Sequence, residues 1–143
     1  MTQIVNLKPA EIWKYFHEIL QIPRPSKKEE KIIQYLMEFG QRHKLETIRD
    51  EIGNILIRKP ATKGMENLQS VVLQCHVDMV CEKNSDVNHD FNVDPINAYV
   101  DGEWVKAKGT TLGADDGIGI AAQLAILASD TIKHGPLECL FTV

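Results

Sequence analysis

The chain has 143 residues, enough for one compact domain with a hydrophobic core, and 43% of them are hydrophobic and 25% charged, as in folded globular proteins. Its formal net charge of -4 gives no large basic field, so neither nucleic acid nor an anionic membrane is expected as a partner. No apolar run approaches the roughly 20 residues that span a bilayer, and the first residues show no signal-peptide pattern.

The first part of the chain is expected to be helical. Apolar side chains recur at helical spacing over residues 9–21, and Pro23 and Pro25 end this pattern. A second helix is predicted over residues 27–44. We expect a capping box to open it, in which the Ser26 hydroxyl accepts the Glu29 N–H and the Glu29 carboxylate reaches back.

Strands are expected after residue 44, because the apolar spacing changes to a period of two. Residues 45–49 and 54–58 predict one hairpin, and residues 98–100 and 104–106 predict another. The continuous apolar run over residues 71–75 predicts a strand that is buried on both faces.

The last part of the chain is expected to form a helix over residues 116–129 and a strand over residues 137–143. Since helices and strands alternate, we predict an α/β layered domain. The final strand is expected to lack a neighbour and to leave apolar surface that favours self-association. Because domains seldom end in an apolar strand, we also expect the chain to be part of a longer domain.

The first candidate for chemistry is His76-Val77-Asp78, directly after the expected strand over residues 71–75. Side chains at the carboxyl end of a strand in an open α/β sheet point into the crevice where ligands bind. Alternation places His76 and Asp78 on the same side, so Asp78 could hold the imidazole in one tautomer, as carboxylates do for metal-bound histidines. A surface histidine beside a loop aspartate explains the same short pattern, and both interpretations stay open.

The second candidate is the pair Asp115-Asp116, which lies between glycines where a loop becomes a helix. Two adjacent carboxylates repel one another and need a cation or solvent, and a carboxylate can bridge two metal ions. An aspartate at this place can instead simply cap the helix. The segment alone does not decide between these two roles.

The other reactive side chains are not expected to take part. Cys75 adjoins His76, but alternation turns it to the opposite face of the strand, where buried cysteines are usually inert. The three cysteines fit neither a disulfide framework nor a zinc cage, so we expect a reduced, cytoplasmic protein. The remaining histidines lie in helical patterns or in polar stretches without a partner at ligand spacing: His17, His43, His89 and His134.

Three segments together resemble a known family: QCHVDMVCEKN, then DPINAYVDGEWVKAKGTTLGADDGIGIAAQLAIL, then GPLECLFTV. In this order and spacing they are similar to the aminoacyl-histidine dipeptidases, which belong to the aminoacylase- and carboxypeptidase-like zinc peptidases. The IPRPS segment matches as well, so the resemblance covers nearly all of the chain. It implies a three-layer α/β/α catalytic domain with a mixed sheet, of which residues 1–143 would be the N-terminal portion, without the lid domain.

The resemblance also implies roles for individual residues. His76 would bind one metal ion, Asp115 would bridge two, and Asp78 would serve the catalytic machinery by orienting His76. The Asp115–Asp116 peptide bond would be cis. The two divalent ions, zinc in the first place and cobalt or manganese as alternatives, would polarise the scissile carbonyl and activate a water. The general base and the remaining ligands would lie beyond Val143.

The sequence therefore predicts hydrolysis of dipeptides of the Xaa-His type, in a protein for which a homodimer is one option. Because the base and several ligands would lie elsewhere, the 143-residue chain alone is expected to be inactive and to bind zinc weakly. Two alternatives stay open: an N-acyl amino acid deacylase of the same superfamily, and a non-catalytic α/β binding module. The Gly-Ala-Asp-Asp-Gly-Ile-Gly segment resembles the dipeptidase branch more than the deacylases.

Overall fold

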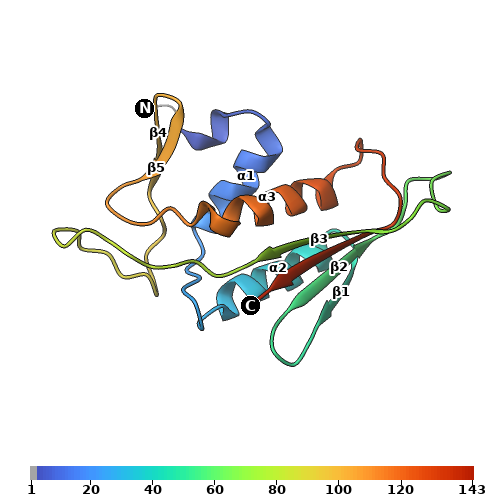
Figure 1. Ribbon diagram of the computed structural model, residues 1–143, viewed down its shortest axis with the longest axis horizontal. Coiled ribbons are helices and arrows are strands. Elements are labelled where there is room, and N and C mark those ends of the chain that lie inside the picture. The colour runs from blue at the N-terminus through green and yellow to red at the C-terminus, as the bar shows by residue number, and fades with distance from the viewer. Residues whose placement is uncertain (1–2) are drawn as a thin grey trace.

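A computed structural model describes residues 3–143 and shows a mixed α/β arrangement (Figure 1). The predicted helices and both predicted hairpins are present. In chain order the elements are η1 (Ile4–Asn6), α1 (Ala10–Leu20), α2 (Glu30–Arg42), β1 (Glu46–Arg49), β2 (Ile55–Lys59), β3 (Val71–His76), β4 (Ala98–Asp101), β5 (Trp104–Ala107), α3 (Ala114–Ala128) and β6 (Leu137–Thr142).

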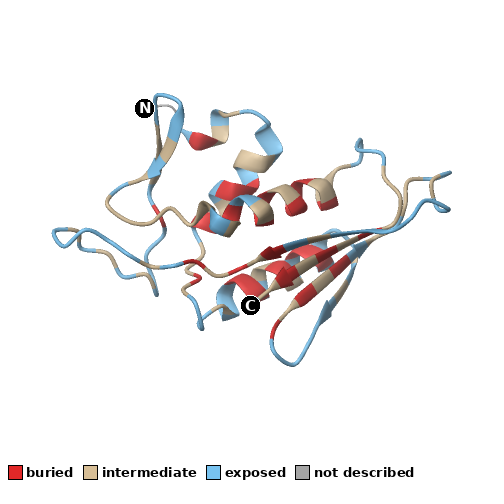
Figure 2. Ribbon diagram, viewed as in Figure 1, coloured by how far each residue is buried: buried red, intermediate tan, exposed pale blue. Residues whose placement is uncertain are grey.

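The main sheet has four strands in the order β1-β2-β6-β3, and β4 and β5 form a separate hairpin. β6 runs antiparallel to β2 and parallel to β3, so the sheet is mixed, as expected. The expectation that the last strand lacks a neighbour is wrong, because β6 is paired on both sides and its side chains are alternately buried (Figure 2).

The strand β3 is more exposed than the sequence predicts. It lies at an edge of the sheet, and Val71 and Val72 are half exposed, at 50% and 55%. Only its C-terminal part is covered, where Cys75 is buried. The apolar run therefore forms a strand, as predicted, but not one buried on both faces.

The helices α2 and α3 lie on the same side of the sheet. On β1, Thr47 packs against Gly40 of α2. On β2, the Lys59 ammonium donates to the carbonyl of Ile126 in α3 at 2.9 Å. Thr47 is paired with Ile57, and Lys59 is two residues further along the same strand, so α2 and α3 cover the same face. Residues 3–143 thus form the mixed sheet and one of the helical layers expected beside it.

The core lies between this face and the helices, and α1 packs against both α2 and α3. The ring of Tyr15 in α1 meets Phe39 of α2 edge-on at 5.7 Å, and the Tyr35 hydroxyl donates to Glu18 at 2.7 Å. Fully buried apolar side chains each stabilise the fold by about 1.5–3 kcal/mol. Those of this size at 0% exposure are Phe16, Ile19, Ile32, Leu36, Phe39, Ile55, Ile57, Ile120, Leu124 and Phe141.

The N-terminus of α2 is not the capping box that the sequence predicts. The helix begins at Glu30, and its N-cap residue Glu29 makes no side-chain cap bond. The Glu29 carboxylate does reach back, but to the backbone N–H of Lys27 at 2.6 Å. The hydroxyl of Ser26 donates to Asp78 instead, a residue 52 positions away. The Ser26 hydroxyl thus makes a tertiary hydrogen bond in place of the expected local helix cap.

Within residues 3–143, no helix has the length and apolar character required to cross a membrane.

Candidate functional site

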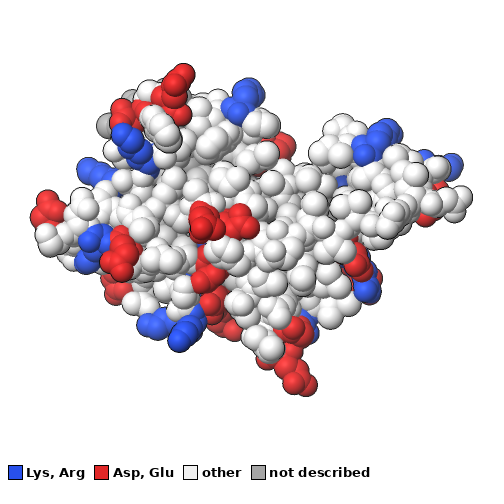
Figure 3. Space-filling model, in the orientation of Figure 1, with Lys and Arg blue, Asp and Glu red and all other residues white. Residues whose placement is uncertain are grey.

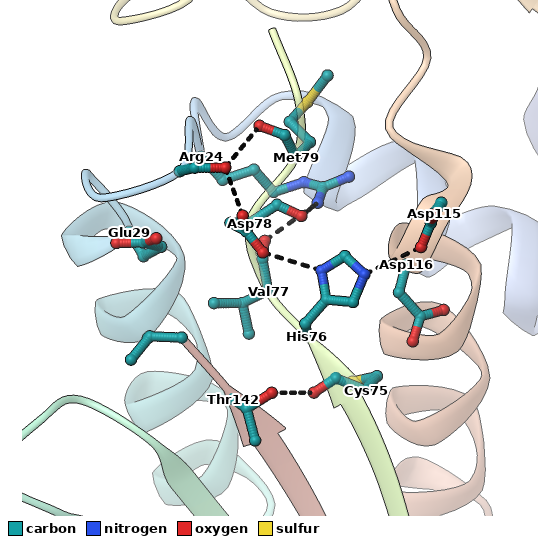
Figure 4. A network of polar contacts seen from close by, with 12 residues as sticks. Arg24, Glu29, Cys75, His76, Val77, Asp78, Met79, Asp115, Asp116 and Thr142 are labelled. Atoms are coloured by element: carbon teal, nitrogen blue, oxygen red, sulfur yellow. Dashed lines mark hydrogen bonds and ion pairs between the residues drawn. The ribbon is translucent and has the colours of Figure 1, made fainter.

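The site is built around His76, the last residue of β3 (Figure 4). Its Nδ1 atom lies 2.9 Å from Oδ1 of Asp78, and its Nε2 atom lies 2.9 Å from Oδ1 of Asp115. The structure therefore brings together the three residues that the sequence singles out, at the carboxyl edge of the sheet. Their side chains differ in exposure, with values of 41% for His76, 27% for Asp78 and 96% for Asp115.

The two adjacent aspartates have different surroundings. The peptide bond between Asp115 and Asp116 is cis, as the resemblance implies, and neither residue has helical backbone angles. Asp116 caps the helix that follows, because its Oδ1 accepts the N–H of Gly119 at 3.1 Å. Asp115 points out of the helix start toward His76. The capping role and the proposed ligand role thus fall on different members of the pair.

The histidine faces carboxylate oxygens on both sides. Burial opposes its positive charge, but the hydrogen bonds to Asp115 and Asp78 together raise the pKa of His76 above its ordinary value. Burial likewise opposes the charge of Asp78, yet hydrogen bonds from Ser26 and His76 lower the pKa of that carboxyl. A neutral imidazole has a single N–H, so only the imidazolium can donate to both carboxylates at once. A cation beside Nε2 and Asp115 would take the place of that second proton.

The site borders an open cavity of about 340 Å³, a volume in the range of small-molecule sites. Figure 3 shows acidic side chains at the centre of this face of the molecule, over the start of α3. Such a surface favours cationic ligands over anionic ones. The cavity is lined by His76, Asp78, Val80, Thr111, Leu112, Gly113, Ala114 and Asp115.

The donor set suits a divalent metal ion, although it is incomplete as a cage. An imidazole nitrogen and a carboxylate oxygen are ordinary zinc ligands. The second ring nitrogen of His76 is hydrogen-bonded to the Asp78 carboxylate, as is usual for metal-bound histidines. In the part of the chain that the structure describes, no group of three or more potential ligands is gathered at one point. The two candidate ligands are therefore those that the sequence names, His76 and Asp115.

None of the other reactive side chains that the sequence analysis considers lines the cavity. Burial raises the pKa of the Cys75 thiol, whose side chain is 1% exposed, so it is unsuited to act as a nucleophile. His43 packs its ring against Phe39 at 4.3 Å, and His89 packs against Phe91 at 4.5 Å. His134 contacts the carbonyl of the next residue.

Sequence reasoning missed two residues that hold the site together, Arg24 and Ser26. Arg24 is 1% exposed. Its guanidinium donates to backbone carbonyls in the segment of Asp78 and in the segment that precedes Asp115. A basic residue between two prolines gives no periodic signal that would reveal burial. The only hint in the sequence is the match of the IPRPS segment to the family.

No protein-family model matches the chain. The cytosol non-specific dipeptidase of Escherichia coli (strain K12) is 53% identical over 143 residues, which are 100% of this chain and 30% of that protein. The crystal structure of the aminoacylhistidine dipeptidase from Vibrio alginolyticus superimposes with a TM-score of 0.98 at 55% identity, over 99% of this chain and 29% of that one.

More distant structures share the fold. A tripeptidase from Staphylococcus aureus matches with a TM-score of 0.73, and an aminopeptidase from Bacillus cereus with 0.74, each at 23% identity over 93% of this chain and 36% of the other. At this identity the likeness shows a common architecture. The chain spans about 30% of the length of the relative from Escherichia coli. Over its whole length it is similar to part of the aminoacylhistidine and cytosol non-specific dipeptidases, as its motifs predict.

Proposed function

We propose that the chain forms part of the active site of a metal-dependent dipeptidase. The observation that carries the proposal is the contact of the His76 Nε2 atom with Asp115 at 2.9 Å, while Asp78 holds the other ring nitrogen. The names of the relatives support peptide hydrolysis, and this arrangement of donors supports a metal-assisted form of it.

His76 and Asp115 would hold the metal ions, with zinc as the first choice and cobalt or manganese as alternatives. Asp115 would bridge two ions, since its side chain is 96% exposed and its second carboxylate oxygen is accessible. When bound, such ions polarise a carbonyl oxygen and lower the pKa of water near them. The residues of this chain would place that chemistry at the edge of the sheet.

Asp78 would act on the histidine. An ionised carboxylate accepts hydrogen bonds only, so once a cation takes the place of a proton on Nε2, the contact of Asp78 at 2.9 Å keeps the remaining proton on Nδ1 of His76. The lone pair of a neutral imidazole then lies on Nε2, toward Asp115 and the cavity. In this role Asp78 fixes both the tautomer and the orientation of the ligand ring.

The substrate would be a dipeptide, with Xaa-His sequences as the first class to test and the cytoplasm as its location. One relative is named aminoacylhistidine dipeptidase, which states a narrow substrate class. The other is named cytosol non-specific dipeptidase, which states a broad one. An N-acyl amino acid deacylase is the alternative within the superfamily.

The test is a chimera in which this chain replaces the matching segment of the Escherichia coli relative. We expect the chimera to hydrolyse dipeptides, including Xaa-His dipeptides, in the presence of zinc, and to leave N-acyl amino acids intact. The same chimera with His76→Ala should be inactive, and the 143-residue chain alone should show no turnover. An inactive but folded chimera would contradict the proposal, and cleavage of N-acyl amino acids alone would assign the deacylase.

A further inference from the structure

The segment between α1 and α2 connects the two parts of the chain that carry the candidate ligands (Figure 4). The Arg24 Nη1 atom donates to the carbonyls of Val77 at 3.0 Å and Asp78 at 3.1 Å, directly after β3. Its Nη2 atom donates to the carbonyl of Gly113 at 2.5 Å, directly before α3. One buried guanidinium therefore fixes the distance between the segment of His76 and that of Asp115.

Two glycines make room for this guanidinium. A Cβ atom on Gly113 would lie 2.6 Å from Arg24 Nη2, and one on Gly117 would lie 2.7 Å from the same atom. Gly113 also has a φ of +73°, a backbone conformation that side chains disfavour. The close approach of the helix start to Arg24 thus depends on the absence of side chains at both positions.

The backbone of the same segment then places Ser26 beside Asp78. The carbonyl of Arg24 accepts the N–H of Met79 at 3.0 Å, and Pro25 forms a parallel bridge with Met79. With the two segments aligned in this way, the Ser26 hydroxyl donates to Oδ2 of Asp78, while Oδ1 of the same carboxylate contacts His76. Each oxygen of Asp78 therefore has its own partner.

We propose that Ser26 is a positioning residue for the metal ligand His76, which acts by holding the Asp78 carboxylate in the rotamer that keeps a proton on Nδ1 of the histidine. The proposal rests on the proposed function, because it concerns the same ligand. Without the hydroxyl, Asp78 keeps one partner and can rotate away from the ring. The Nε2 lone pair is then less firmly directed at the cavity.

The first test measures the histidine directly and needs no metal. With 15N-histidine in the whole chain, NMR at a pH at which the ring nitrogen shifts show His76 to be neutral gives its tautomer and the exchange rate of its Nδ1 proton. We expect Ser26→Ala to speed that exchange about tenfold, the equivalent of one charge-assisted hydrogen bond. Ser26→Thr should restore the slow rate, and the matched control Ser70→Ala, at the opposite end of β3, should leave it unchanged.

The second test is a double-mutant cycle read by cobalt binding, followed through the visible absorption of the bound ion. Outer-shell changes of this kind cost about 10–100-fold in metal affinity, and we expect Ser26→Ala to fall at the lower end. If Ser26 acts only through Asp78, then Ser26→Ala should cause no further loss in an Asp78→Ala background. Additive losses would overturn the proposal, because Ser26 would then act by another route.

The outcomes separate this inference from the proposed function. If His76→Ala abolishes cobalt binding while Ser26→Ala behaves like Ser70→Ala in both tests, the metal site stands and the role of Ser26 is overturned. If the chain and His76→Ala bind cobalt alike, the metal site fails, and proton exchange alone decides whether Ser26 positions the ring. Unchanged melting of Ser26→Ala alongside faster exchange would exclude a loss of folding as the cause.

Discussion

His76 and Asp115 are 39 positions apart in the sequence, yet the histidine Nε2 atom lies 2.9 Å from the aspartate Oδ1 atom. The contact joins the end of β3 to the start of α3, and Arg24 fixes the backbone on both sides of it. A flexible surface pair would not need a buried guanidinium to hold its two backbone segments in place. If His76 and Asp115 hold a metal ion as proposed, their geometry is therefore set before the ion binds.

Mutations of Asp115 and of Asp116 should affect different properties, metal binding for the first and stability for the second. Asp115→Asn should weaken metal binding with little effect on stability, since the Asp115 side chain is 96% exposed. Asp116→Ala should lower the free energy of unfolding by about 1 kcal/mol, the usual cost of losing a helix cap. Calorimetric metal titration and urea unfolding of both variants test this. Equal loss of stability in the two would show that the capping role is wrongly assigned.

Arg24→Met should be among the most destabilising single changes in the chain. It removes the donor from three carbonyls while the position stays buried, at 1% exposure. We expect a loss of about 3–5 kcal/mol in the free energy of unfolding. The matched control is Arg49→Met, because Arg49 forms an exposed ion pair with Glu30 and should cost less than about 1 kcal/mol. Equal melting temperatures for the two variants would contradict this account of Arg24.

The turn between β1 and β2 should contribute stability that depends on pH. Hydrogen bonds from the Asn54 side chain and from the backbone of Gly53, Asn54 and Ile52 lower the pKa of the Asp50 carboxyl. A carboxyl with a lowered folded-state pKa stabilises the fold fully above its unfolded pKa of about 3.9 and loses that contribution as pH falls through the folded value.

The measurement is the difference in urea midpoint between the chain and Asp50→Ala across this acidic range. We expect the chain to be more stable than the variant at neutral pH, and the gap to close on acidification. Glu51→Ala, in the same exposed turn, serves as control for the removal of a carboxylate from this turn. A difference for Asp50→Ala that stays constant down to strongly acidic pH would contradict the assignment.

Local patterns in the sequence predict the helices, strands and hairpins well, but they do not predict the order of strands that are far apart in the chain. The helices and hairpins follow from periodicity and turn residues, which act over a few positions. The places of β3 and β6 in the sheet do not, because the parallel pairing of Val71 with Leu137 joins residues far apart in the chain. The more regularly apolar strand β6 takes the centre, and β3 takes the edge.

In the candidate site, too, local contacts could be predicted from the sequence and long-range contacts could not. His76 and Asp78 could be assigned to one side of a strand from alternation alone, and the structure confirms that geometry. The local pattern, which lies within four residues, predicts that Ser26 caps α2, whereas its partner Asp78 is 52 positions away. The burial of Arg24 depends on space left by Gly113 and Gly117, which no local pattern reveals.

Zinc titration calorimetry on the purified chain is the direct test of whether His76 is a metal ligand. Weak but measurable binding is expected, since His76 and Asp115 alone fall short of the three protein ligands usual at a catalytic zinc. His76→Ala should weaken zinc affinity by at least about tenfold, whereas His17→Ala, on the exposed side of α1, should leave it unchanged. Equal zinc affinity in the His76→Ala and His17→Ala variants would show that His76 is not a metal ligand.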